Sequence, residues 1–110
     1  MEGGCYSFCL ETKVKETYPA LALASLAEAA EMPCQVGSMV ESAIGTMAGA
    51  HLAMSRSIIE TNEMVGPLML DVAAVKYNGD VIQFSDRPGI GIEVDEEYVK
   101  EITCFSCEIK

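Results

Sequence analysis

The feature that most constrains the fold is the order of segments in the first sixty residues. Two alanine-rich stretches with helical spacing, Ala20–Glu31 and Ser42–Ser55, alternate with three short β-prone segments, Cys5–Val14, Cys34–Gly37 and Ser57–Glu60. Apolar residues three and four positions apart are typical of a helix with one buried face, and short apolar runs are typical of buried strands. A strand–helix–strand–helix–strand order requires right-handed crossover connections and therefore predicts a parallel sheet.

The sequence changes character after Gly66-Pro67 and predicts three further elements. These are a hairpin whose arms Val72–Tyr77 and Val81–Phe84 flank Asn78-Gly79, a short helix over Glu96–Glu101 capped by Asp95, and a final strand over Ile102–Ile109. The length of 110 residues allows a single domain, residues 1–110, and is less than half of the roughly 250 residues that a complete (β/α)8 barrel takes.

Composition excludes several classes of partner. With 17 acidic against 7 basic side chains and a net charge of −10, the chain leaves no basic patch for nucleic acid or for an anionic membrane. The longest uncharged run, Ser42–Ser55, is shorter than the roughly 20 residues of a membrane-spanning helix. The first residues lack the positive start and apolar block of a secretory signal, so a cytoplasmic location is expected.

The five cysteines are Cys5, Cys9, Cys34, Cys104 and Cys107. Without an export signal, reduced thiols acting as small buried hydrophobic residues are expected. The two spaced pairs, near the two ends, are an alternative set of four zinc ligands. Residues three apart in the predicted final strand point to opposite faces, however, and converge poorly on one ion.

Chemistry in a parallel α/β sheet gathers at the carboxyl ends of the strands. Lys13 lies at the end of the first predicted strand, Glu41 follows the second, and Glu63 follows the third. A buried lysine of lowered pKa can remove a proton next to a carboxylate, with carboxylates or a metal balancing the enolate charge. The alternative is structural: Glu41 as a first-turn carboxylate favoured by the helix dipole, and Lys13 as a solvated lysine.

Helical periodicity also predicts which side chains are buried. The expected stripes are Leu23, Leu26, Ala27 and Ala30 in the first helix, and Ile44, Met47, Ala48, His51 and Leu52 in the second. His51 is therefore interpreted as a core histidine rather than a ligand. The Gly45-x3-Gly49 pair is interpreted as close packing of the helix against another element, since each glycine costs roughly 1 kcal/mol relative to alanine.

Three ordered stretches carry a family resemblance. The segment from Leu26 to Gly45, then the segment from Glu63 to Leu70, and finally the segment from Pro88 to Asp95 resemble the enolase superfamily. The most similar group is the muconate lactonizing enzyme and mandelate racemase family. The resemblance covers Tyr18 to about Glu101. It implies an α/β fold consisting of about three β/α units of a barrel, followed by a hairpin, a short helix and a C-terminal strand.

The resemblance also implies a chemistry and a set of site residues. The family consists of Mg2+-dependent enzymes that remove a proton next to a carboxylate and stabilise the resulting enediolate on the metal. By position, the catalytic residues are Lys13 and Glu41, and the substrate-binding residues are Ser38, Met39 and Glu63. An ungapped alignment places Lys13 at the acid/base position, whereas Lys15 requires a two-residue deletion.

The chain departs from the family in ways that define two interpretations. It lacks the second-strand Lys-x-Lys pair and the three acidic metal ligands of strands three to five, so no Mg2+ is expected on this chain alone. The first interpretation is a C-terminal fragment of a muconate-cycloisomerase-like enzyme, inactive on its own. The second is a standalone structural or interaction protein derived from that segment. A metal- or thiol-dependent binding module is a third class.

Open sheet edges predict assembly. Three β/α units leave unpaired strand edges that favour pairing with another chain. We therefore expect a homo-oligomer, in its simplest form a two-fold dimer, that completes the sheet or exchanges a terminal strand, Cys5–Leu10 or Ile102–Ile109. A small carboxylate substrate is expected only where the barrel is completed.

Overall fold

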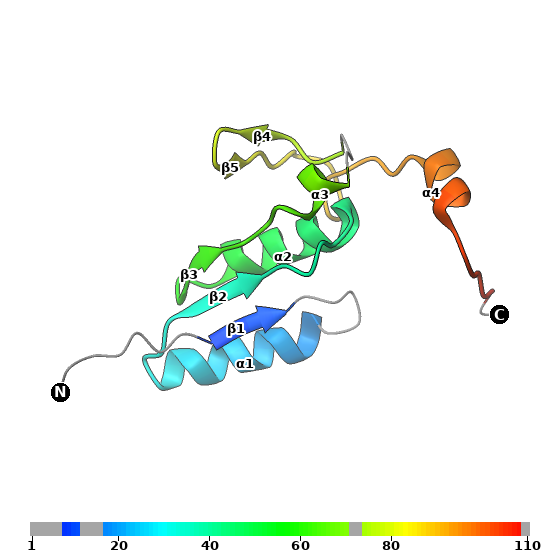
Figure 1. The fold of residues 1–110 in the computed structure, drawn as a ribbon. Helices are drawn as coiled ribbons and strands as arrows, with labels where there is room; N and C mark the ends of the chain where they lie inside the picture. Colours follow the sequence, from blue (N-terminus) through cyan, green and yellow to red (C-terminus); the bar gives the residue numbers. More distant parts are fainter. Residues whose placement is uncertain (1–7, 12–16, 71–73, 109–110) are drawn as a thin grey trace.

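A parallel sheet of three strands organises the first half of the chain (Figure 1). The computed structural model describes residues 8–11, 17–70 and 74–108. The elements in order are β1 (Phe8–Glu11), α1 (Thr17–Ala29), β2 (Cys34–Gly37), α2 (Ala43–Ser55) and β3 (Ile59–Asn62). The sheet order is β1-β2-β3 and both pairings are parallel. The alternation predicted from the sequence is confirmed.

The register aligns the strands at their carboxyl ends. Glu11 of β1 lies opposite Gly37 of β2, and Asn62 of β3 lies opposite Val36. The β2–β3 ladder contains one irregularity, because Ile59 pairs with Cys34 and Thr61 pairs with Gln35, which leaves the residue between them without a partner in this ladder. All three arrows in Figure 1 point the same way, so the segments that follow the strands share one edge of the sheet.

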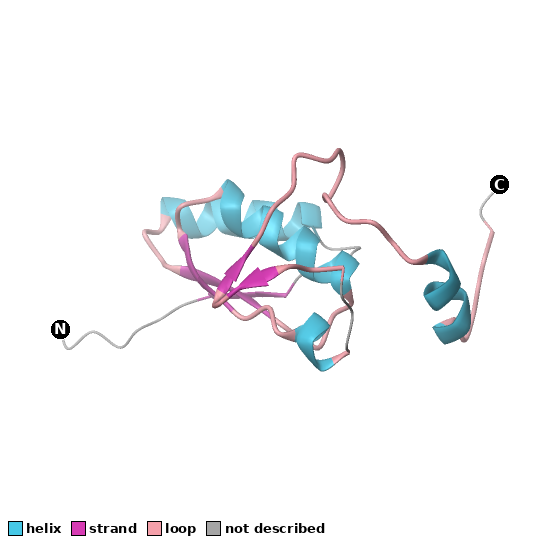
Figure 2. Cartoon of the chain, turned by 90° about the horizontal axis from the view of Figure 1, so that it is seen from above, coloured by secondary structure: helices cyan, strands magenta, loops and turns pink. Residues whose placement is uncertain are grey.

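Both long helices lie on the same side of the sheet, as Figure 2 shows. The core between the helices and the sheet combines apolar residues of α1, β2, α2 and β3: Ala20, Ala24, Ala27, Cys34, Val36, Leu52 and Ile59. Small side chains on the buried face of α1 allow this helix to lie close to the strands.

The predicted helix faces are only partly right. In α1, Ala27 is buried as expected, but Leu23 and Leu26 are 51% and 68% exposed. The alanines pack against the sheet, so the leucines face outward. In α2, Met47 and Leu52 are buried as expected, whereas His51 is exposed. The prediction of a core histidine is wrong, because the buried face of α2 consists largely of small residues such as Gly49 and Ala50 and does not include His51.

The second half contains short elements, and all but the last of them pack on α2. They are α3 (Gly66–Met69), the antiparallel pair β4 (Tyr77–Asn78) and β5 (Val81–Ile82), and α4 (Glu96–Ile102). Met47 and Ala43 of α2 form a second core cluster with Val75, to which residues of the hairpin and the following loop add. The hairpin is shorter than predicted and its turn lies at Gly79 and Asp80, because Asn78 pairs with Val81.

The predicted C-terminal strand is wrong over the described residues. Helix α4 extends to Ile102, and the segment Thr103–Glu108 is not a strand; Ile109 lies outside the described residues. In Figure 1 this segment runs away from the sheet. A strand needs a neighbouring strand to pair its backbone groups, and the described part of the chain offers none here.

Candidate functional site

The turn after β2 places a carboxylate at the carboxyl edge of the sheet. β2 ends at Gly37 and α2 begins at Ala43, with Ser42 at its N-cap position. Between them the chain reverses sharply, and Val40 has a φ of 61°. A β-branched residue rarely adopts this left-handed conformation, which costs on the order of 1–3 kcal/mol. Such strain persists only where the surroundings hold it, and here it orients Glu41.

Local hydrogen bonds fix the Glu41 carboxylate. Oε2 accepts a hydrogen bond from Ser38 Oγ at 2.6 Å, and Oε1 accepts one from the Met39 backbone amide at 2.7 Å. The Ser38 hydroxyl oxygen also accepts from the Val40 amide at 3.3 Å. Burial raises the pKa of Glu41, but these hydrogen bonds outweigh it and hold the pKa below its ordinary value. Glu41 is therefore an ionised, oriented side chain.

Two glycines approach Glu41 more closely than any other residue type could. A Cβ on Gly66, the first residue of α3, would lie 2.3 Å from the Glu41 backbone oxygen and 2.8 Å from its nitrogen. A Cβ on Gly45 of α2 would lie 2.9 Å from Glu41 Cβ. The close packing predicted for Gly45 is confirmed, and the element it lies against is the turn after β2.

The remaining predicted site residues are placed as follows. Glu63 directly follows β3, its side chain is exposed, and its amide donates to the Val36 carbonyl oxygen at 2.8 Å. The Met39 side chain is also exposed. The structure thus brings Ser38, Met39 and Glu41 into one turn and places Glu63 after the neighbouring strand. Lys13, and Lys15 as its alternative, lie outside the described residues.

Sequence reasoning misses Gly66 as a part of this site. The Gly66-Pro67 pair marks only a boundary in the sequence, whereas in the structure it is the point at which α3 contacts the turn. Tyr77 is missed as well: its hydroxyl donates to the Met64 carbonyl oxygen at 2.7 Å, joining the hairpin to the segment after β3. A glycine directly before a helix-starting proline is the one sequence signal that points here.

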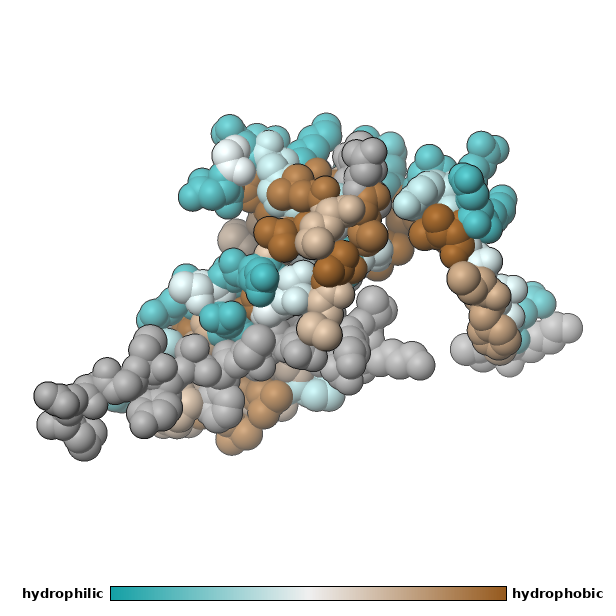
Figure 3. All heavy atoms as spheres, in the orientation of Figure 1, coloured by the Kyte–Doolittle hydropathy of each residue, from teal (hydrophilic) through white to brown (hydrophobic). Residues whose placement is uncertain are grey.

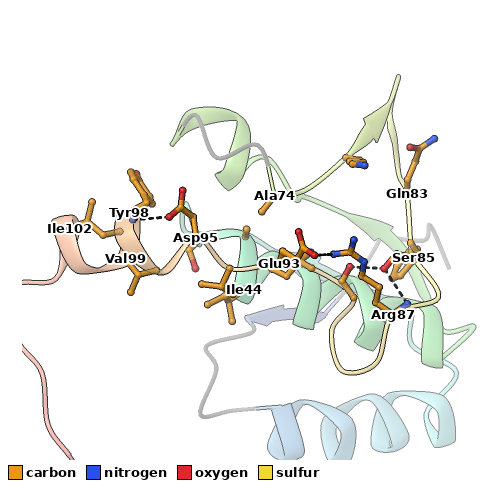
Figure 4. Close-up of a pocket in the computed structure, with 17 residues that line it drawn as sticks. Ile44, Ala74, Gln83, Ser85, Arg87, Glu93, Asp95, Tyr98, Val99 and Ile102 are labelled. Atoms are coloured by element: carbon orange, nitrogen blue, oxygen red, sulfur yellow. Dashed lines mark hydrogen bonds and ion pairs between the residues drawn. The ribbon is translucent and has the colours of Figure 1, made fainter.

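A groove of about 900 Å3 lies elsewhere, between α4 and the body of the structure (Figure 4). Ile44 and Ala74 line it on one side and Tyr98 on the other, and the Arg87–Glu93 ion pair lies at its border. None of the turn residues 38–41 lines this groove. Its walls combine apolar residues with exposed polar and charged ones, and no metal-binding group forms among the described residues, so we place the candidate chemistry at the strand ends and not in the groove.

The described residues do not form a metal site. No group of three His, Cys, Asp or Glu side chains comes together among them. Mg2+ prefers several oxygen ligands in octahedral geometry, and Glu41 supplies one carboxylate whose oxygens already accept hydrogen bonds. Within the described part, Cys34 is buried while Cys104 and Cys107 are exposed. Burial, with a smaller contribution from Glu28, raises the pKa of the Cys34 thiol and keeps it protonated.

None of the helices that the structure describes is long and apolar enough to cross a membrane.

Residues 12–98 match the sequence model of the enolase C-terminal domain-like family. The chain belongs to that family. The resemblance to the enolase superfamily predicted from the ordered motifs is therefore confirmed, and the match covers both the turn after β2 and the segment after β3.

Three family members illustrate the similarity. The N-succinyl-L-Arg/Lys racemase of Bacillus cereus is 44% identical over 90 residues, 80% of this chain and 24% of that protein; its crystal structure matches 81% of this chain with a TM-score of 0.71. The dipeptide epimerase of Cytophaga hutchinsonii, solved with Mg and the dipeptide D-Ala-L-Val, matches 86% of this chain and 27% of its own, with 29% identity and a TM-score of 0.73.

The muconate lactonizing enzyme of Pseudomonas putida matches 84% of this chain and 28% of its own, with 28% identity and a TM-score of 0.71. The chain thus spans about a quarter of the length of these enzymes. These structural neighbours are enolase-superfamily barrel proteins, and the part they share with this chain is its small α/β portion.

Proposed function

We propose that this chain is the C-terminal part of the barrel of an enolase-superfamily enzyme that removes a proton from the carbon next to a carboxylate. In this proposal β1, β2 and β3 are the sixth, seventh and eighth strands of the barrel. The observation that carries it is the turn after β2, which orients an ionised Glu41 carboxylate at the carboxyl edge of the sheet. Active sites of barrel enzymes lie at this edge.

The lowered pKa of Glu41 favours a role for this residue that differs from the role of Lys13. A carboxylate whose pKa lies below the ordinary value is a weak base, so Glu41 is poorly suited to accept a proton from carbon. We assign proton removal to the neutral amine of Lys13. The C–H electron pair passes into the substrate carboxylate to give the enediolate, and the proton stays on the lysine as ammonium. The Glu41 anion favours that ammonium electrostatically.

The family is Mg2+-dependent, and a bound Mg2+ would supply charge stabilisation for the enediolate. The described residues do not fit a Mg2+ site, so no step of this proposal is assigned to the metal. The ligands would come from the remainder of a complete barrel. The isolated chain is therefore proposed to be inactive, because electrostatic stabilisation of the developing charge contributes several kcal/mol in such reactions.

We propose an N-acylated α-amino acid as the substrate class. The racemase from Bacillus cereus acts, by its name, on N-succinyl-arginine and N-succinyl-lysine, and it is 44% identical to this chain, against 28% for the muconate lactonizing enzyme. A dipeptide, the substrate class named for the Cytophaga enzyme, is also an acylated amino acid. In both, the proton to be removed lies between an amide nitrogen and a carboxylate.

A chimera tests the proposal. The matching 90-residue stretch of the Bacillus cereus racemase is replaced by the residues of this chain. Exchange of the α-hydrogen of N-succinyl-L-arginine in D2O is then followed by NMR. We expect the chimera to catalyse exchange and the isolated chain to show none above buffer. Lys13→Ala and Glu41→Gln should each lower the exchange rate by roughly a hundredfold or more.

The matched control is Glu60→Gln, an exposed glutamate of β3 that lies nearer the amino end of the sheet. It should change the exchange rate less than about twofold, an effect below roughly 0.5 kcal/mol. The proposal fails if the chimera folds but does not catalyse exchange, or if Glu41→Gln behaves like the control.

A further inference from the structure

The start of α3 is seated directly on the backbone of the turn after β2. Gly66 is buried and is the first residue of α3. Its Cα side faces the Glu41 peptide, where a Cβ would lie 2.3 Å from the carbonyl oxygen, 2.8 Å from the nitrogen and 3.1 Å from the carbonyl carbon. Contacts under 3.0 Å do not occur for real Cβ atoms. Only glycine allows this approach.

The contact involves backbone on both sides, so it has little room to adjust. A Cβ on Gly45 would meet the Glu41 side chain, at 2.9 Å from Cβ and 3.2 Å from Cγ. The backbone fixes the position of Glu41 Cβ, so rotation of the side chain does not relieve this contact, but at 2.9 Å it is less close than the 2.3 Å between a Cβ on Gly66 and the Glu41 carbonyl oxygen. Gly66 therefore constrains the position of Glu41 more strongly than Gly45 does.

The constraint acts on a turn that is strained and held by short-range hydrogen bonds. Val40 lies at a φ of 61° immediately before Glu41, and the Met39 amide must stay 2.7 Å from Glu41 Oε1. If the Glu41 peptide is displaced, Val40 can relax towards an ordinary conformation. The Met39 amide and the Ser38 hydroxyl then no longer converge on the carboxylate.

We propose that Gly66 is a positioning residue for the Glu41 carboxylate, acting through the close approach of α3 to the turn after β2. The catalytic part of this inference rests on the proposed function, whereas the positioning part does not. The start of α3, which follows β3, the proposed eighth strand of the barrel, would thereby determine the position of the Glu41 carboxylate, which follows β2, the proposed seventh strand.

The first test needs no activity and uses the full chain. The Glu41 side-chain carboxyl is titrated by 13C NMR in the unsubstituted chain and in Gly66→Ala. We expect the pKa of Glu41 to move up in Gly66→Ala, since the hydrogen bonds from Ser38 and Met39, which help to lower it, are lost. The matched control is Gly79→Ala: Gly79 lies at a φ of 65° with nothing within 4 Å of the position that a Cβ would take, so the pKa of Glu41 should not move.

A second measurement covers the case in which Gly66→Ala does not fold. In the unsubstituted chain, a nuclear Overhauser contact is expected between the Gly66 α-protons and the Glu41 amide proton. Its absence overturns the inference, as does a folded Gly66→Ala variant whose Glu41 titration matches that of the unsubstituted chain.

The catalytic consequence is measured in the racemase chimera. Gly66→Ala should lower kcat for α-hydrogen exchange by roughly a hundredfold, the effect of a misplacement of about 1 Å within an active site, with a smaller change in KM. An unchanged kcat overturns the catalytic part. If the titration moves but Glu41→Gln leaves the exchange rate unchanged, Gly66 positions Glu41 and it is the proposed function that fails.

Discussion

Ser38 makes two hydrogen bonds through one hydroxyl group at the end of β2. It donates to the Glu41 carboxylate at 2.6 Å and accepts from the Val40 amide at 3.3 Å. The side chain is only half-buried, so solvent weakens both interactions. At the residue scale, this hydroxyl links the strained backbone of Val40 to the ionised state of Glu41.

Replacing Ser38 by alanine should lower the free energy of unfolding by about 1 kcal/mol at pH 7. This is less than the roughly 1.5–3 kcal/mol of a buried hydrogen bond to a charged group, because the pair is partly exposed. The pKa of Glu41 is lower in the folded chain than its ordinary value of 4.5. The stabilisation is thus present above pH 4.5 and is lost as the pH falls through the lower folded-state pKa.

Urea unfolding at a series of pH values measures this effect. The difference between the unsubstituted chain and Ser38→Ala should be largest above pH 4.5 and should decrease in acid to the part contributed by the hydrogen bond from the Val40 amide. Ser57→Ala, in an exposed turn, is the control and should show no such dependence. A difference that stays constant across the pH range contradicts the role given to Ser38.

Individual site residues are predictable from the sequence only where the signal is local or carried by family motifs. Glu41 and Glu63 follow strands that periodicity already locates. The contact of Gly66 with Glu41 joins residues 25 positions apart in the sequence, and nothing in either segment specifies so short a distance. The strained conformation of Val40 cannot be predicted from the sequence either, because it is imposed by the surrounding packing and not by the residue type.

Elements show the same division between local and long-range causes. Helix α4 begins as predicted, because Asp95 Oδ1 accepts from the amides of Glu97 and Tyr98, each at 3.0 Å. Capping is local, and the sequence therefore locates helix starts well. The prediction for the buried face of α1 is right for Ala27 and wrong for Leu23 and Leu26, because periodicity cannot decide between alanine and leucine faces until the packing partner is known. The final strand fails for the related reason that β-prone residues need a neighbour.

Asp95→Ala should remove most of the helical structure of α4. This helix has seven residues and none of them is buried, so packing contributes little and the cap, worth about 1 kcal/mol, decides whether the helix forms. The 13Cα secondary shifts of residues 96–102 measure it.

The control for this prediction is Asp86→Ala, an exposed residue outside the helices. The shifts of α1 and α2 should be unchanged in both variants. If residues 96–102 keep helical shifts in Asp95→Ala, then contacts of α4 with the residues that line the neighbouring groove stabilise this helix, and the cap does not.

At the scale of the whole molecule, the described chain leaves apolar surface and strand edges open. β1 and β3 are the outer strands of the sheet. Apolar atoms gather on the face over α3 (Figure 3), and the exposed apolar residues around this helix are Val65, Leu68, Met69 and Leu70. Large contiguous apolar patches on a protein surface often mark sites of interaction with another protein. We propose that the isolated chain self-associates through a sheet edge, as its topology predicts.

Light scattering at micromolar concentration tests this proposal. We expect a mass of at least twice 11.8 kDa. Thr61→Lys places a charge on an outer strand and should shift the mass towards the monomer, because lysines on edge strands oppose pairing. Glu97→Lys on α4 adds the same residue away from the sheet and should leave the mass unchanged. A monodisperse 11.8 kDa species contradicts the proposal.

Glu60, the residue of β3 that has no partner in the β2–β3 ladder, marks a position at which related sequences can gain or lose a residue. Glu60 has no partner between the Cys34–Ile59 and Gln35–Thr61 pairs, so deleting it leaves each of these pairings possible. Deleting a residue between Glu63 and Gly66 would instead draw α3 away from the turn it rests on. Insertions and deletions should therefore be tolerated at the start of β3 and eliminated by selection after its end, although the two places are only a few residues apart.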